Sequence, residues 1–91
     1  MEEVRNLEQL RAEIDAIDDE IMAAFAKRMK LSAEIAEYKK NNNIPVLDID
    51  REKFKLDRIA KDADEELAAF TSKLYLTLAD LSKDYQNMIN K

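Results

Sequence analysis

The first residues whose types and spacing suggest chemistry are two cations. Arg28 interrupts an otherwise apolar helical stripe, and a guanidinium in such surroundings needs either an internal carboxylate or an anionic ligand. Lys39 follows eleven residues later, which on a helix is about 20° from the same face and roughly 16 Å along the axis. Two long cationic side chains so placed could hold opposite ends of a small polyanion. The structural alternatives stay open: an internal ion pair for Arg28, and for Lys39 a charge that only complements the end of its helix.

Arg11 is a third cation that could join them. It lies on the flank of the same stripe, about 25 Å from Arg28 along a helix, so the two cannot touch one small molecule within a single chain. In an antiparallel dimer, Arg11 of one chain would be carried toward Arg28 of the other. An ordinary exposed arginine is the alternative.

Two further groups contain neutral and acidic side chains. Asp48, Arg51 and Glu52 cluster where a second helix is predicted to start, and a capping aspartate with first-turn charges would explain them structurally. Ser82 and Gln86 are i, i+4 neighbours beside a late apolar stripe. They are either boundary residues or neutral hydrogen-bond donors to a buried ligand.

Composition excludes several classes of function. The chain has no His and no Cys, so we expect no metal site, no cofactor and no histidine acid–base chemistry. A net charge of −5 argues against a sequence-independent nucleic-acid binder. The longest apolar run, Ile21–Ala26, is far too short to span a membrane, and Glu2 and Glu3 do not suit a signal peptide. We expect a cytoplasmic protein.

The element that must position these residues is a long helix over Leu7–Lys40. Asn6 and Gln9 predict a capping box at its start. The helix would be roughly 50 Å long, whereas a globule of this chain length is about 30 Å across. Because the apolar stripe continues to both ends, a second copy of the chain related by a two-fold axis is expected to cover it. The stripe comprises Leu7, Leu10, Ile14, Ile17, Ile21, Ala24, Leu31, Ile35 and Tyr38.

The rest of the chain predicts two more helices and no sheet. Asn41–Leu47 is expected to be a loop, in which an Asn adopts the left-handed conformation and Ile44 is extended by Pro45. A second helix should follow the N-cap Asp48, and a third, capped by Asp62 or Asp64, should run to about Asn90. The third helix carries the stripe Leu67, Phe70, Leu74, Leu78, Leu81, Tyr85 and Met88. The chain has no Gly and one Pro, with 46 % hydrophobic and 38 % charged residues, which favours an all-α fold. We predict a single domain over residues 1–91.

The ordered set of these residues resembles the all-helical AroQ-type chorismate mutases. The resemblance is carried by Ser82, Gln86 and three stretches: LRAEIDAID from Leu10 to Asp18, AKRMKLSAEIAEYK ending at Lys39, and IPVLDIDRE from Ile44 to Glu52. It covers nearly the whole chain. It implies an intertwined homodimer of three-helix chains, in which the long first helix contributes to both active sites, and the Claisen rearrangement of chorismate to prephenate.

The resemblance also implies a role for each residue. Arg11 from the partner chain and Arg28 would bind the two carboxylates of the substrate, and Lys39 would serve a carboxylate and the ether oxygen. Gln86 would donate a hydrogen bond to that oxygen from the other side. Glu52, with Asp48, would receive the ring hydroxyl, while Arg51 and Ser82 would complete the pocket wall. An isochorismate pyruvate lyase-like enzyme and a non-catalytic helical dimerisation module are the alternatives.

Overall fold

The computed structural model describes residues 5–91 and is helical, with no strand in that range. Its helices are α1 (Leu7–Asn41), α2 (Ile49–Asp62) and α3 (Ala68–Ile89). The prediction of an all-α chain with a long first helix is confirmed. The chain divides into two compact units, Met1–Lys30 and Leu31–Lys91, and α1 contributes residues to both.

The start of α1 is fixed by the reciprocal capping box that the sequence predicts. The Asn6 side chain accepts from the backbone N–H of Gln9 at 2.9 Å, and the Gln9 side chain accepts from the backbone N–H of Asn6 at 2.9 Å. Two N–H groups that the helix itself cannot satisfy are therefore paired. Glu8 adds a negative charge in the first turn, where the helix dipole favours it.

The end of α1 is a Schellman motif built on an asparagine. Asn43 has a φ of 56°, and the N–H groups of Asn43 and Ile44 donate back to the carbonyls of Lys40 at 3.4 Å and Lys39 at 2.8 Å. This pairing satisfies carbonyls that the last helical turn leaves without partners. The left-handed asparagine predicted for this loop is confirmed, and the following Pro45 cannot continue the helix.

Helix α2 begins as predicted, but α3 does not. The Asp48 side chain accepts from the backbone N–H of Arg51 at 3.0 Å, as an N-cap should. The prediction that Asp62 or Asp64 caps α3 is wrong. Asp62 is the last residue of α2, and the Asp64 backbone carbonyl closes a turn with the N–H of Leu67 at 2.8 Å. Because of this turn, the N-cap of α3 is Leu67, three residues after Asp64, and no side chain caps the helix.

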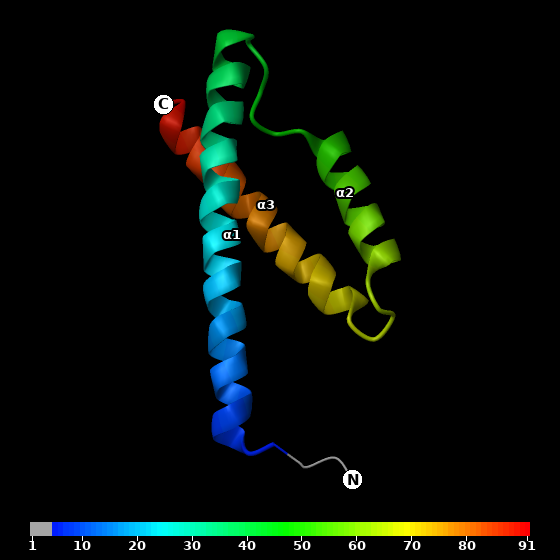
Figure 1. Ribbon diagram of the computed structural model, residues 1–91. Coiled ribbons are helices and arrows are strands. Elements are labelled where there is room, and N and C mark those ends of the chain that lie inside the picture. The colour runs from blue at the N-terminus through cyan, green and yellow to red at the C-terminus, as the bar shows by residue number, and fades with distance from the viewer. Residues whose placement is uncertain (1–4) are drawn as a thin grey trace. The chain divides into compact units, whose positions relative to one another are not determined.

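In the second unit, α2 and α3 pack together and α3 crosses the C-terminal part of α1 (Figure 1). Two hydrogen bonds between side chains and α1 mark this crossing: Ser32 Oγ to Ser82 Oγ at 2.7 Å, and Asn90 Nδ2 to the Ala36 carbonyl at 2.9 Å. The buried residues near these bonds include the small side chains of Ser32, Ala36 and Ser82. The crossing therefore depends on polar pairing as well as on apolar contact.

The buried apolar residues of the described chain are few: Ala36, Tyr75 and Ala79. The face that α3 buries follows Tyr75, Ala79, Ser82 and Gln86, which is offset from the stripe that the sequence suggests. In both long helices, most large apolar stripe residues remain exposed, including Leu7, Leu10, Ile14, Ile17, Ile21, Leu31, Ile35, Leu67, Phe70, Leu74, Leu81 and Met88. A single chain thus leaves apolar surface of the kind that marks an interaction face.

Candidate functional site

The most buried polar side chains of the described chain meet at the crossing of α1 and α3. Ser32, Ser82 and Gln86 are 3 %, 9 % and 5 % exposed. Ser82 and Gln86 lie one turn apart on α3, and Gln86 Nε2 donates to Ser82 Oγ at 3.0 Å. Ser32 comes from α1, with its Oγ 2.7 Å from Ser82 Oγ. We call these three residues the hydroxyl–amide cluster; it shows that Ser82 and Gln86 are not boundary residues.

Two buried acceptors beside this cluster have no partner among the described residues. They are Gln86 Oε1 and Asn90 Oδ1; Gln86 lies in the last turn of α3, and Asn90 is the C-cap of that helix. A buried carbonyl without a hydrogen bond costs about 1–3 kcal/mol, so such groups are uncommon unless something else satisfies them. The α1–α3 crossing therefore has unused capacity to accept hydrogen bonds.

Lys39 lies at the end of α1 and is partly buried. Its Nζ donates to the backbone carbonyl of Val46 at 2.7 Å, which ties the loop after α1 back onto the helix. An ammonium group has three hydrogens, so this contact uses only part of its donor capacity. The Val46 carbonyl thus holds the Lys39 ammonium group in place. None of the ion pairs described for residues 5–91 joins Lys39 to a carboxylate.

The three predicted residues at the start of α2 have different surroundings. Asp48 uses one carboxylate oxygen as the N-cap, and Arg51 is exposed. Glu52 is partly buried and pairs with Lys83 of α3 at 2.9 Å. The structure therefore brings Glu52 into contact with α3, although it precedes Lys83 by 31 positions in the sequence.

Lys83 is not among the residues that the sequence pattern predicts for the site. Its Nζ also contacts Asp80 at 3.2 Å, and hydrogen bonds to Glu52 and Asp80 raise the pKa of Lys83 above its ordinary value of 10.5. The i, i+3 spacing of Asp80 and Lys83 is visible in the sequence. The contact with Glu52 is not, because it depends on how α2 packs on α3.

Arg11 and Arg28 belong to the first unit. Arg11 is exposed, whereas Arg28 is partly buried. Both lie within α1. The six remaining predicted residues, Lys39, Asp48, Arg51, Glu52, Ser82 and Gln86, all belong to the second unit.

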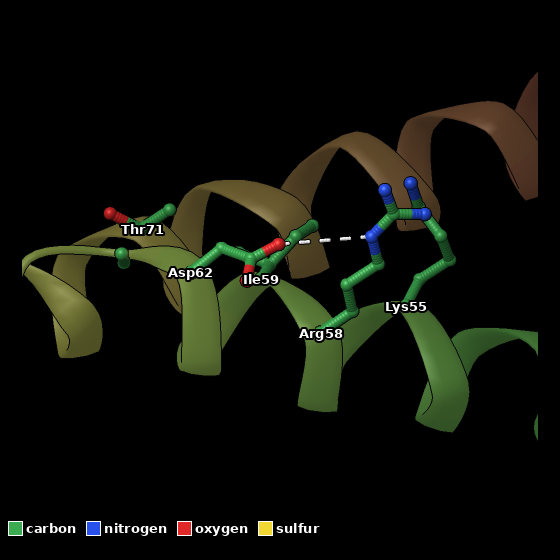
Figure 2. Close-up of a pocket in the computed structure, with 6 residues that line it drawn as sticks. Lys55, Arg58, Ile59, Asp62 and Thr71 are labelled. Carbon is green, nitrogen blue, oxygen red and sulfur yellow. Dashed lines mark ion pairs between the residues drawn. The ribbon is translucent and has the colours of Figure 1, made fainter.

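A separate shallow pocket of about 340 Å³ lies between α2 and α3 (Figure 2). It is lined by Lys55, Arg58, Ile59, Asp62, Ala63 and Thr71. Arg58 Nε is 3.7 Å from Asp62 Oδ2, so one of its two cations already has an anionic neighbour. None of the predicted site residues lines this pocket, and its open shape does not suit a ligand that must be enclosed.

Within residues 5–91, no group of three or more acidic side chains is arranged to hold a metal ion. None of the described helices is long and apolar enough to cross a membrane.

Comparison with known proteins gives one family and several relatives. Residues 10–87 match the model of the family described as chorismate mutase type II. Over 58 residues, 64 % of this chain and 59 % of the relative, the chain is 40 % identical to a chorismate mutase of Methanocaldococcus jannaschii. It is 46 % identical over 54 residues, 59 % of this chain, to a bifunctional chorismate mutase/prephenate dehydratase of Buchnera aphidicola, covering 14 % of that protein.

A third relative has a different named substrate. The chain is 35 % identical over 63 residues, 69 % of its length, to a 4-amino-4-deoxychorismate mutase of Streptomyces venezuelae, and covers 61 % of that protein. The matched part of the chain thus spans about three fifths of the two single-function relatives and a small part of the bifunctional one. No solved structure matches the chain.

Proposed function

We propose that this chain, which belongs to the chorismate mutase type II family, catalyses the rearrangement of chorismate to prephenate. The observation that carries the proposal is the extent of the family match. It runs over residues 10–87 and so includes all of the predicted site residues. We further propose that residues 1–91 act as one functional domain.

The reaction is an isomerisation that needs no group beyond these side chains. The ether C–O bond to the ring breaks while a C–C bond forms between the enolpyruvyl group and the ring, and no atom enters or leaves. The catalyst must hold the dianion in a folded conformer and stabilise the charge that develops on the ether oxygen. Arginine, lysine and glutamine can supply both effects without a proton transfer.

In the proposed site, cations bind the two carboxylates. Arg28 and, from the partner chain, Arg11 would each bind a carboxylate with two parallel hydrogen bonds, a geometry that lysine cannot supply. Lys39 would use its remaining hydrogens for a carboxylate and the ether oxygen. Its contact with the Val46 carbonyl supports this role, since it holds the ammonium group in place before substrate arrives.

Neutral and acidic side chains complete the proposed site. Gln86 would donate to the ether oxygen from the side opposite Lys39; its burial supports the role, because a hydrogen bond is stronger where water is excluded. Glu52 and Asp48 would accept from the ring hydroxyl, and Arg51 and Ser82 would line the wall. Glu52 pairs with Lys83 at 2.9 Å, and a carboxylate in an ion pair acts as a hydrogen-bond acceptor only.

We also propose a homodimer in which Arg11 acts in trans. The exposed stripe of α1 supports it: Ile14, Ile17 and Ile21 are 56 %, 52 % and 49 % exposed in the single chain. Fully burying an isoleucine side chain contributes about 1.5–3 kcal/mol. A two-fold axis would bury the same residues of both copies at once.

A second candidate substrate is the 4-amino analogue named for the Streptomyces relative. A carboxylate such as Glu52 can accept from a hydroxyl or from an amine, so this residue alone does not choose between them. The test is to incubate the protein separately with chorismate, 4-amino-4-deoxychorismate and isochorismate. Prephenate formation is the expected result; pyruvate release from isochorismate would indicate the lyase, and no turnover of any substrate would indicate a non-catalytic module.

A further inference from the structure

We propose that Ser32 is a positioning residue for Gln86, acting through the hydroxyl group of Ser82. The inference rests on the proposed function, in which Gln86 donates to the ether oxygen. Ser32 Oγ lies 2.7 Å from Ser82 Oγ, and Gln86 Nε2 lies 3.0 Å from the same oxygen. Ser32 is 3 % exposed, so it is placed to contact its neighbour and not the solvent.

The inference follows from counting hydrogens in the cluster. Ser82 has one hydroxyl hydrogen, and its oxygen accepts from Gln86 Nε2. Ser32 Oγ is close enough to accept that hydrogen. While Ser32 does so, Ser82 acts toward Gln86 only as an acceptor. Gln86 Nε2 is then held toward Ser82 by one of its two hydrogens, and the second is available for a ligand.

Without Ser32, the hydrogen of Ser82 would lose the acceptor that the Ser32 oxygen supplies. Gln86 Oε1 is itself buried without a partner among the described residues. A half turn of the Gln86 amide would pair the two groups, at the expense of moving Nε2 away from its present position. Because the oxygen and the nitrogen of an amide are similar in size, packing does not distinguish the two orientations. Ser32 distinguishes them when its oxygen accepts the hydrogen of Ser82, because Ser82 can then only accept from Gln86 Nε2.

The position of Ser32 in the sequence supports a specific role for its hydroxyl. It lies inside the C-terminal third of α1, seven residues before Lys39 and hence near the same face. Alanine has the higher helix propensity at such a position, and a buried hydroxyl is unfavourable unless it is hydrogen-bonded. A serine here is therefore best explained by the partner that it meets on α3.

The test uses the full chain with chorismate. In Ser32→Ala we expect kcat to fall about tenfold, as when nine amides in ten adopt the unproductive orientation, and KM to stay within about twofold, since the cations that bind the carboxylates are unchanged. In a Gln86→Ala background, Ser32→Ala should have no further effect on kcat. Ser32→Thr, which keeps the hydroxyl, should restore most of the activity, and Ser72→Ala, which removes a partly buried hydroxyl elsewhere on α3, should leave kcat unchanged.

An unchanged kcat in Ser32→Ala, or an equal fall with and without Gln86, would overturn the inference while leaving the proposed function intact. Absence of turnover by the unaltered protein would instead overturn the proposed function. If the unaltered protein shows no turnover, the NMR signals of the Gln86 side-chain amide decide whether Ser32 orients it. A change in its two hydrogen shifts in Ser32→Ala, but not in Ser72→Ala, supports it; unaltered shifts in both refute it.

Discussion

Replacing Gln86 by glutamate should confine catalysis to acidic solution. The substitution changes the carboxamide group to a carboxyl group of nearly the same shape, at a side chain that is 5 % exposed. A protonated carboxyl can still donate to the ether oxygen, whereas an ionised one cannot and places a negative charge beside it. The activity should therefore follow the fraction of protonated carboxyl.

The size of the effect follows from the surroundings of Gln86. The ordinary pKa of a glutamate is about 4.3, so at pH 7.5 fewer than about one carboxyl in a thousand is protonated. Burial at a site whose recorded hydrogen-bond partner is the neutral Ser82 hydroxyl should raise the pKa of the introduced carboxyl. Losing one donor to a developing negative charge costs about 3 kcal/mol, or roughly 100-fold in kcat. We expect at least that loss at pH 7.5, with recovery of about tenfold per pH unit on acidification until the carboxyl is mostly protonated.

The assay is the initial rate of chorismate consumption from pH 4.5 to 8.5, each point divided by that of the unaltered protein. Gln86→Met, which has similar length and no donor, should be slow at every pH. Asn87→Asp makes the same change of charge at the adjacent exposed position and should keep the ordinary profile. Activity of Gln86→Glu equal to that of the unaltered protein at pH 7.5, or a profile parallel to it, would refute the role of Gln86 as the neutral donor.

Three further predictions concern assembly and stability. Ile17→Asp removes an apolar side chain that is 52 % exposed in the single chain. The lost burial should weaken association by about 1 kcal/mol per copy, or about 2 kcal/mol per dimer, so sedimentation should show a dimer at least about 30-fold weaker. An equally tight dimer contradicts the proposed interface. Mixing inactive Arg11→Ala and Arg28→Ala chains should restore activity by giving one intact site per heterodimer, and no recovery after subunit exchange speaks against an arginine acting in trans. Because the pKa of Lys83 is raised above 10.5, its ion pairs stabilise the fold below that pH and lose their effect as the pH rises through the higher folded value. Urea unfolding from pH 9 to 11.5 should therefore show the free energies of unfolding of the unaltered protein and Lys83→Met converging, whereas a constant difference would exclude this linkage.

Local features of the fold could be predicted because they depend on residues three or four apart. The capping box of Asn6 and Gln9, the N-cap Asp48 and the left-handed asparagine after α1 all follow from such short-range rules. The start of α3 could not be predicted in this way. Asp62 and Asp64 both have capping chemistry, and an additional turn, set by the backbone, made neither of them the cap.

The site was only partly predictable because its contacts join distant parts of the chain. Ser82 and Gln86 were selected by type and spacing, but their burial depends on where α3 crosses α1. Ser32 lies seven residues before Lys39. This spacing indicates that the two residues share a face of α1, but it does not indicate that Ser32 contacts Ser82. The pairing of Lys83 with Glu52 has no short-range signal, since it arises from packing between two helices.

The left-handed turn at Asn43 explains how a chain without glycine can form the turn that ends α1. Asn43 is the one residue in the range 5–91 recorded with a positive φ, and asparagine tolerates that region better than most side chains. The other described residues have no positive φ recorded, so their backbone requires no glycine. The absence of glycine also affects the unfolded state. Because glycine is the most flexible residue, an unfolded chain without it has fewer conformations and loses less conformational entropy when it folds.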